Sequence, residues 1–504
     1  MFRTHFRVAS VALCLLAPLS AQDIPITERT LANGMRVLLV ERHDGPTIAC
    51  GWVARVGSAD ERPGITGIAH LFEHMMFKGT KVIGTRDPRR DAELNAQQDQ
   101  VMVEVRKEVD LLREKLRRGE ITSLDDPRAR SPRHQQLLEQ MGRLVQEQRS
   151  LIVKDELDKV YQEFGATGMN ANTTQDRTFF HIDVPANKLE LWAWLESDRL
   201  RNAVFREFYS ERDVVLEERR MRIDATPTGK FQEAFNAMIW QASPYSWPVI
   251  GWPSDITQVT RDQADYFFST YYAPNNITAI LVGDFQTKDA LALVERYFGG
   301  IPSHSKARPM VTTLEPPQTA EQRLLVNAEA TPTVTEAYKI VPAVHKDCAA
   351  LDVLCFALNG QSGRLHRELV GHQHVAVRTG SADDTQKFGG VFYMEVTPAP
   401  GHSPEEVQLL LDQELDKLKT EGITERELQK VKNQVQATCY RRMEANDSLR
   451  DQLAEAESTG SYRDFLEEPA RLQAVTREDV MRVARQYLTA ENRTTMLIHR
   501  KEAK

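Results

Sequence analysis

The segment Ala69-His70-Leu71-Phe72-Glu73-His74-Met75 combines two residue patterns in one short run. Apolar residues in and around it recur at the spacing of one helical face, which predicts an amphipathic helix packed against the protein. They are Ile68, Leu71, Phe72, Met75 and Met76. Because successive helical residues are rotated by about 100°, His70, Glu73 and His74 project from the opposite face. Two histidines one turn apart can reach a single metal ion, with a carboxylate beside it.

The order His-x-x-Glu-His is the inverse of the commoner metalloprotease motif. Zn²⁺ binds nitrogen and oxygen ligands, and a hydrolytic zinc site keeps one position free for water. Glu73 is then the expected general base, which takes a proton from water whose pKa the ion lowers to about 7. Two histidines leave the ligand set incomplete, so a third ligand must come from elsewhere. The alternative is an ordinary amphipathic helix whose polar face is merely solvated.

The composition is that of an ordinary globular chain. It has 504 residues and a formal net charge of −8, which allows two to four domains and does not suggest nucleic-acid binding. Arg3 and Arg7 precede an apolar run over residues 8–19, which is typical of a signal peptide and too short for a stable membrane span. We therefore expect a signal peptide over residues 1–21 and an exported protein, either periplasmic or secreted.

The five cysteines are too sparse for a disulfide scaffold and lack the spacing of a zinc ribbon. Cys14 lies in the expected signal peptide. We expect the other four to be buried free thiols, with a single disulfide in an oxidising compartment as the alternative.

Sheet and helix signals alternate along the rest of the chain. Strands are predicted at residues 37–40, 47–56, 168–185 and 277–282, and helices at residues 187–199 and 210–220. Thr66 is the expected N-cap of the motif helix.

Between about residues 83 and 160, two stretches with a heptad-like apolar seam predict a charged antiparallel helical hairpin. Gln148 interrupts the seam of the second stretch. We interpret this insertion as a solvated strut, with a lid or a partner-binding arm as the alternative.

Two parts of the chain repeat each other. Residues 259–278 match residues 475–494 without a gap at an offset of 475 − 259 = 216. Residues 211–214 match residues 425–428 at an offset of 425 − 211 = 214. Two copies of one fold are the natural interpretation.

The second copy lacks the polar residues of the motif. With an offset of 214, Glu218 corresponds to Lys432, and the counterpart of the motif helix falls near residues 351–358, which contain no His and no Glu. If these residues only formed a solvated helix face, their joint absence from the second copy would be unexplained. This pattern favours one active half and one silent half.

Three further motifs accompany the motif helix: Phe77-Lys78-Gly79-Thr80, Asn170-Ala171 and the acidic segment from Glu211 to Glu218. With them, the chain resembles the pitrilysin/insulinase/mitochondrial processing peptidase family of inverted-motif zinc peptidases over about residues 24–500. It is most similar to the bacterial exported members of this length.

The resemblance implies an α+β fold of two homologous units, each a mostly antiparallel sheet covered by helices. Residues 22–310 would form the catalytic zinc peptidase domain, with the helical insertion at about residues 83–160. Residues 318–504 would form the homologous non-catalytic domain.

The resemblance also implies a role for each polar residue of the site. His70, His74 and Glu218 would bind Zn²⁺, and Glu73 would be the general base. Glu211, two turns before Glu218 on the same helix face, would support the site from behind the ligands. Glu217 competes as a ligand, but the family spacing of seven from Glu211 falls on Glu218, and adjacent side chains point about 100° apart.

Substrate contacts are expected at two places. The strand with Asn170, Ala171 and Asn172 matches the family's edge strand, which receives an extended peptide through backbone hydrogen bonds. An ordinary paired strand is the alternative. Family members often place an Arg and a Tyr seven residues apart in the second half to hold substrate carbonyls, and here Arg367 is present but His374 replaces the Tyr.

The incomplete Arg/Tyr pair suggests that a second chain of the same fold completes the cleft, as a homodimer or a heterodimer. The expected function is a zinc-dependent endopeptidase that hydrolyses peptides or unfolded polypeptides in an enclosed cleft. The alternative is a peptide-binding or assembly subunit without major activity of its own.

Overall fold

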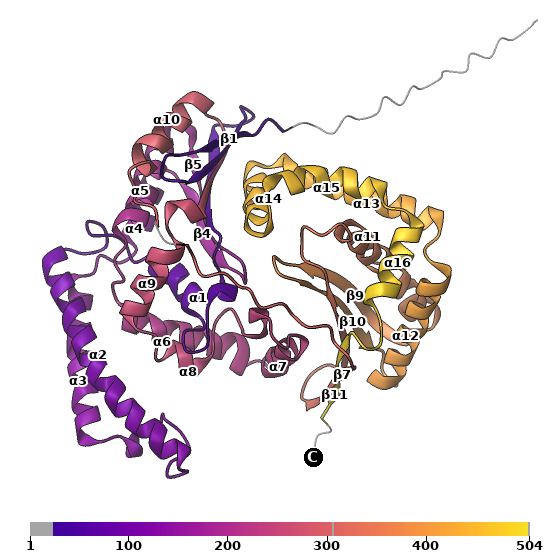
Figure 1. Cartoon of the computed structure of the whole chain (residues 1–504), viewed down its shortest axis with the longest axis horizontal. Coiled ribbons are helices and arrows are strands. Elements are labelled where there is room, and N and C mark those ends of the chain that lie inside the picture. The colour runs from indigo at the N-terminus through magenta and orange to yellow at the C-terminus, as the bar shows by residue number, and fades with distance from the viewer. Residues whose placement is uncertain (1–23, 305–306, 502–504) are drawn as a thin grey trace, which may run out of the picture.

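The computed structural model describes residues 24–304 and 307–501, and the expected signal peptide lies outside them. The chain forms two β-sheets, each covered by helices (Figure 1). The predicted α+β fold with two homologous units is thereby confirmed.

The first sheet contains six strands in the order β1-β2-β6-β3-β5-β4. Their bounds are β1 Thr27–Thr30, β2 Arg36–Glu41, β3 Thr47–Ala54, β4 Thr167–Thr173, β5 Thr178–Pro185 and β6 Ile277–Gly283. Only β2 and β6 pair in parallel. All residues of β3 except Thr47 are buried, because helices cover both faces of this sheet.

The second sheet repeats this arrangement with five strands in the order β7-β11-β8-β10-β9. Their bounds are β7 Gln322–Ala328, β8 Thr333–Ile340, β9 Ala376–Thr385, β10 Gly390–Pro398 and β11 Arg493–Arg500. Again a single pair, β7 with β11, is parallel. The strand order matches that of the first sheet without β1, which agrees with the sequence repeat.

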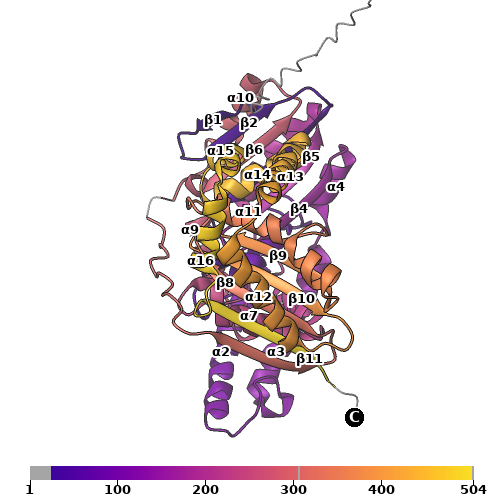
Figure 2. The ribbon, with the colours of Figure 1, turned by 90° about the vertical axis from the view of Figure 1, so that its right-hand side faces the viewer.

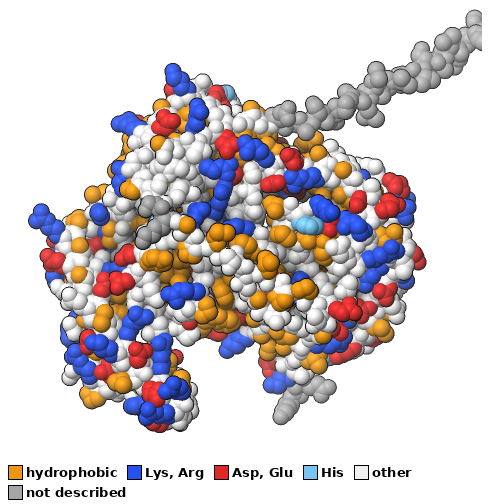
Figure 3. Space-filling view, viewed as in Figure 1, with side chains coloured by type: hydrophobic (Ala, Val, Ile, Leu, Met, Phe, Trp, Pro, Cys, Tyr) orange, Lys and Arg blue, Asp and Glu red, His pale blue; other side chains and the backbone are white. Residues whose placement is uncertain are grey.

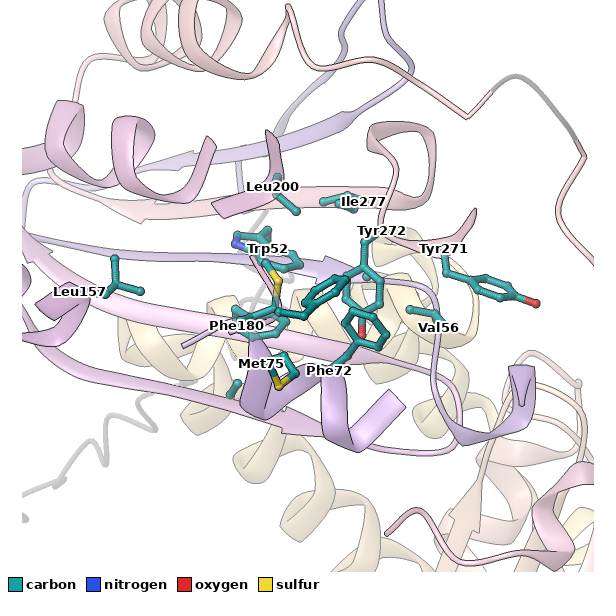
Figure 4. Close-up of a cluster of buried hydrophobic side chains, with 14 of the residues drawn as sticks. Trp52, Val56, Phe72, Met75, Leu157, Phe180, Leu200, Tyr271, Tyr272 and Ile277 are labelled. Atoms are coloured by element: carbon teal, nitrogen blue, oxygen red, sulfur yellow. The ribbon is translucent and has the colours of Figure 1, made fainter. Parts of the chain in front are cut away.

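Each sheet packs against helices from its own half of the chain. In the first half these are α1 Ile68–Met75, α5 Leu189–Asn202, α6 Phe208–Arg219, α9 Arg261–Tyr271 and α10 Thr287–Phe298, with the short α8 Pro253–Ile256 beside α6. In the second half they are α11 Cys348–Leu358, α12 Pro404–Glu421, α13 Glu425–Glu444 and α16 Arg477–Tyr487. Figure 4 shows part of the first core, where Trp52 stacks on Phe180 at a ring distance of 4.3 Å beside Phe72 and Met75.

The two halves also exchange helices. α7 Gly229–Ile239 leaves the first half and packs on the second sheet, where Phe235 and Ile239 join its buried residues. α14 Asn446–Thr459 and α15 Tyr462–Ala474 come from the second half, and α14 covers β3 and β6 of the first sheet (Figure 1). Neither sheet is therefore fully covered by its own half.

The predicted helical hairpin consists of α2 Pro88–Arg117 and α3 Pro132–Leu151, followed by α4 Glu156–Glu163. It projects from the two sheets, and its surface is densely charged (Figures 1, 2 and 3). The seam is buried over much of its length, while Leu116 lies exposed near the tip. Gln148 does not interrupt it: this side chain is buried and donates to Asp91 and Asn95, both at 2.8 Å.

All four cysteines in the described part of the chain are free, as expected. Within residues 24–304 and 307–501, no helix is both long and apolar enough to cross a membrane.

Candidate active site

α1 lies on the first sheet with its apolar face turned inward. Phe72 packs between Phe205, at a ring distance of 4.9 Å, and Tyr272, at 5.4 Å. Leu71 and Met75 are buried in the same cluster. The apolar spacing therefore fixes which way the helix faces, and His70, Glu73 and His74 line a cavity on its other side.

The start of α1 differs from the prediction. Its N-cap is Gly67, which has a φ of 87°, and not Thr66. The carboxylate of Glu61 accepts hydrogen bonds from the backbone N–H groups of Gly67 at 2.9 Å and Ala69 at 2.8 Å. Thr66 is used elsewhere, because its hydroxyl donates to Asp255 at 2.8 Å and accepts from the backbone of Trp252 at 3.0 Å. The carboxylate of Glu61, six residues before Gly67, thus takes the role of the N-cap side chain.

His70, His74 and Glu218 converge on one point, with one ligand atom from each lying within 4.8 Å of the others. Oε2 of Glu218 lies 3.3 Å from Nε2 of His74 and 3.7 Å from Nε2 of His70. Glu218 comes from the last turn of α6, which packs against α1. The structure therefore brings together two residues of the motif and a carboxylate far along the chain.

This donor set fits Zn²⁺. Two imidazole nitrogens and a carboxylate oxygen are typical zinc ligands, and ligands roughly 2.0–2.2 Å from one ion lie between about 3 and 4 Å apart. Burial, together with the nearby charges of His74 and Arg222, lowers the pKa of His70 to about 3. Its imidazole is therefore neutral, which is the form that binds a metal.

His74 is oriented from behind by Glu211. Nδ1 of His74 lies 2.9 Å from Oε1 of Glu211, whose Oε2 accepts from Nζ of Lys78 at 2.6 Å. Burial alone would raise the pKa of Glu211, but the hydrogen bond from His74 and the charge of Lys78 hold it below its ordinary value. The ionised Glu211 keeps Nε2 of His74 turned toward Glu218. Lys78 was not identified from the sequence as part of this chain of contacts.

Glu73 lies beside the three converging residues. Its Oε2 accepts a hydrogen bond of 2.7 Å from Oγ1 of Thr173, at the end of β4. Burial raises the pKa of Glu73, and the bond from Thr173 partly opposes this shift. A raised pKa makes the carboxylate a better proton acceptor. Thr173 lies within the predicted strand region of residues 168–185, but nothing in the sequence linked it to Glu73.

The two adjacent glutamates at the end of α6 point in different directions, as the helical rotation predicts. Glu217 is half-exposed and pairs with Arg220 at 2.6 Å. Glu218 faces the histidines through Oε2, and its Oε1 lies 2.8 Å from Nη1 of Arg222. Arg222 is a second contact that the sequence did not reveal.

A cavity of about 910 Å³ opens in front of these residues. Asn170, Ala171 and Asn172 line it from β4, the last strand of the first sheet, so one edge of this strand has no neighbouring strand in the described part of the chain. The opposite wall comes from the second half and includes Gln386 and Tyr393. The cavity therefore lies between the two halves, with a strand edge along one side.

The structure does not bring Arg367 to this cavity. Its guanidinium pairs with Glu368 at 3.3 Å and with Glu427 at 3.2 Å, and it does not line the cavity. His374 is exposed, and its Nδ1 lies 3.0 Å from the carbonyl of Val370. Neither residue is among those that line the cavity beside His70 and His74.

The counterpart of the motif helix in the second half is α11, within which the expected residues 351–358 lie. Leu351, Leu354 and Cys355 are buried there. Lys432, the counterpart of Glu218, donates to the backbone carbonyl of Gln473 at 2.8 Å. No second group of three converging His, Cys or carboxylate ligands occurs among the residues that the structure describes.

Two family models match the chain. Residues 36–103 match "Insulinase (Peptidase family M16)", and residues 258–435 match "Peptidase M16 inactive domain". The first match contains α1, and the second contains α11.

Known proteins are similar over nearly the whole length. The zinc protease PqqE of Helicobacter pylori is 26% identical over 477 residues, which cover 93% of this chain and 91% of that protein. The uncharacterized zinc protease YmxG of Bacillus subtilis is 22% identical over 474 residues, which cover 92% of this chain and 96% of that protein.

Solved structures agree with this similarity. A protease from Helicobacter pylori superposes with a TM-score of 0.76 at 25% identity, covering 95% of this chain and 99% of that one. The periplasmic protease PqqL of Escherichia coli superposes with a TM-score of 0.69 at 17% identity, and there the match covers 96% of this chain but 48% of PqqL. This second likeness concerns the fold alone.

Proposed function

Because the chain belongs to the insulinase family of peptidases, family M16, we propose that it is a zinc-dependent endopeptidase acting on peptides or unfolded polypeptides. The observation that carries the proposal is the convergence of His70, His74 and Glu218 beside Glu73, in a cavity bordered by a strand edge. We assign the catalytic part to residues 22–310 and the non-catalytic part to residues 318–504.

His70, His74 and Glu218 would hold the zinc ion. When bound there, zinc supplies a Lewis acid that polarises a water molecule and the substrate carbonyl. Glu211 holds the imidazole of His74 in the tautomer whose Nε2 is free to bind.

Glu73 would act as the general base and accept a proton at a carboxylate oxygen from the attacking water. The hydroxyl of Thr173 occupies Oε2 of Glu73, which leaves Oε1 for that proton. The pKa of Glu73, raised by burial, suits it both to accept a proton and to pass it to the leaving amine.

The strand edge at Asn170, Ala171 and Asn172 would bind the substrate as an added strand. Backbone hydrogen bonds read the peptide without regard to most of its side chains, so we expect broad sequence tolerance. The volume of the cavity, about 910 Å³, suits a stretch of extended chain better than a folded protein.

Arg367 lies away from the cavity, so a second chain of the same fold is needed if such an arginine is to meet the substrate. We therefore propose a working homodimer or heterodimer. We also propose export to the periplasm or the exterior, from the apolar run at residues 8–19 and the periplasmic location in the name of PqqL.

The alternative is a subunit that binds peptides or assists assembly without cutting. It draws support from the apolar α11 and from the match of residues 258–435 to an inactive domain. One observation argues against this alternative: a chain that does not cut peptides has no need of all four of His70, Glu73, His74 and Glu218.

The test is to incubate the purified full chain with Zn²⁺ and a mixed peptide pool and to analyse the products by mass spectrometry. We expect internal cleavage by the wild type and a loss of about 10³-fold in rate for Glu73→Gln, within the usual range for a general base. Zinc content should be unchanged in that variant. Undiminished cleavage by Glu73→Gln would refute the assignment of the base, and intact peptides with the zinc-loaded wild type would favour the binding subunit.

A further inference from the structure

The two oxygens of Glu218 have different partners. Oε2 faces the histidines, at 3.3 Å from His74 and 3.7 Å from His70. Oε1 lies 2.8 Å from Nη1 of Arg222. Arg222 thus contacts the one oxygen of this carboxylate that the histidines do not.

The backbone on both sides of Arg222 is fixed by contacts with neighbouring segments. Arg222 lies on a π-helical turn, Arg220–Asp224, that continues α6. Just before the turn, the buried Arg219 donates to both carboxylate oxygens of Glu233 on α7 at 2.7 Å and to the carbonyl of Gly251 at 3.0 Å. Just after it, the chain folds back so closely that Gly229 leaves no room for a Cβ beside the carbonyl of Ile223. The guanidinium of Arg222 therefore starts from a fixed backbone position.

We propose that Arg222 is a positioning residue for the metal, which restrains Glu218 to bind through Oε2 alone. This inference rests on the proposed zinc function. A carboxylate can bind a metal through one oxygen or two, and a second bound oxygen would occupy the position that a hydrolytic zinc site keeps free for water. By holding Oε1, Arg222 keeps that position open.

A competing role for Arg222 is to bind an acidic group of the substrate, since its side chain is 72% exposed and lines the cavity. The two roles differ in what they change. A positioning residue alters the metal site of the free protein, whereas a substrate-binding residue alters KM and leaves the metal site as it was.

The chain offers a matched control two residues away. Arg220 lies on the same turn, is 68% exposed and pairs at 2.6 Å with Glu217, the neighbour of Glu218. Arg220→Ala thus removes an equivalent exposed ion pair that does not touch the converging ligands.

The experiment compares wild type, Arg222→Ala, Arg222→Gln and Arg220→Ala as metal-free full-length chains. Zn²⁺ affinity is measured by competition with a chromogenic chelator, and the coordination of Co²⁺ is followed by its visible absorption. We expect Arg222→Ala to bind Zn²⁺ about 10-fold more weakly, the lower end of the usual range for residues that orient ligands. The visible absorption of bound Co²⁺ should weaken, because a second oxygen of the Glu218 carboxylate then binds the ion. After loading with Zn²⁺, Arg222→Ala should show a lower kcat and an unchanged KM. Arg220→Ala should match the wild type.

Arg222→Gln keeps the stem of the side chain and gives the same test if the alanine variant does not fold. Equal Zn²⁺ affinity and equal Co²⁺ spectra in the Arg222 and Arg220 variants would overturn the proposal. So would a rise in KM alone, which would assign Arg222 to the substrate. A wild type that binds no Zn²⁺ would instead overturn the proposed function itself, and this inference with it.

Discussion

α1 and α11 occupy corresponding places on two sheets whose strand orders match apart from β1, yet α1 carries His70, Glu73 and His74 whereas α11 contains no His and no Glu. In α11, Leu351 and Leu354 are fully buried, and the helix is apolar almost throughout. The fold therefore needs a helix at this place but does not need His70, Glu73 or His74. The second half has the same fold without these residues, so we infer that their role in the first half is chemical and not structural.

The difference extends beyond the two helices. Around α1, other elements supply Thr173, Glu211 and Arg222, each in contact with one residue of the site. In the second half, Lys432 replaces the glutamate of α6 and binds a backbone carbonyl. The two halves thus differ as whole sets of contacts, and the comparison can be tested residue by residue.

The largest expected effect is on metal binding. Glu218→Gln should weaken Zn²⁺ binding by more than about 100-fold, beyond the range of changes that only disturb the support of ligands, because it removes a charged ligand. Glu217→Gln on the neighbouring position is the control and should bind as the wild type does. Elemental analysis after dialysis measures both, and unchanged zinc in Glu218→Gln would contradict the ligand assignment.

Substitutions in the second half should change the stability of the protein and not its metal binding. Leu354→Ala in α11 removes a fully buried side chain and should lower the free energy of unfolding by about 2–5 kcal/mol. Glu73→Ala in α1 should change stability by less than about 1 kcal/mol, because the lost hydrogen bond from Thr173 is offset by removal of a carboxylate whose pKa burial raises. Urea unfolding of the metal-free proteins compares the two. A stable Leu354→Ala would mean that α11 is not needed for the second core.

A smaller effect is expected where β4 meets the site. Thr173→Val removes the hydrogen bond to Glu73 and should lower kcat/KM by about 10- to 100-fold, the equivalent of roughly 1.5–3 kcal/mol for a bond to a charged group. Thr173→Ser should keep most of the activity. Thr385→Val, at the corresponding end of β9, is the control in the silent half and should have no kinetic effect. Equal kcat/KM values for Thr173→Val and Thr385→Val would show that the hydroxyl of Thr173 does not contribute to catalysis.

The smallest effects concern two carboxyls that precede the compared helices. Burial raises the pKa of Asp60 to about 6, whereas bonds from Arg482 and Tyr487 lower the pKa of Asp347. Between about pH 4 and 6 the folded chain holds the proton of Asp60 more tightly than the unfolded chain, so stability falls as pH rises. For Asp347 the sign is opposite, and its contribution is lost as pH falls below about 4.

We therefore expect Asp60→Asn to stabilise the protein at pH 7.5 by about 1–2 kcal/mol and to have no effect at pH 4. Asp347→Asn should destabilise it at pH 7.5, with the difference shrinking in acid. Thermal unfolding at both pH values, each against the wild type, measures these shifts. If Asp60→Asn and Asp347→Asn changed thermal stability in the same direction, the opposite contributions expected from these two carboxyls would be wrong.

Much of the site could be predicted because its key signals are local. His70, Glu73 and His74 lie within one helical turn and a half, and their shared face follows from the apolar spacing of α1. Glu218 was predicted from the resemblance to the peptidase family, whose spacing of seven from Glu211 falls on it, and the lack of the motif in the second half was predicted from the repeat. Thr66 failed as a cap because its hydroxyl binds Asp255, 189 residues away, which no local rule could foresee.

The sequence by itself determined the polar and apolar faces of the motif helix and the inserted hairpin, because each depends on residue periodicity along a short stretch. It also determined the two-fold repeat, because matching segments recur at a nearly constant offset. Only the tertiary structure decided that Thr173 meets Glu73 across 100 residues of chain, that Arg222 holds the outer oxygen of Glu218, and that α7 and α14 cover each other's sheets. These contacts join distant segments, and their geometry is set by how the sheets and helices pack rather than by any pattern in neighbouring residues.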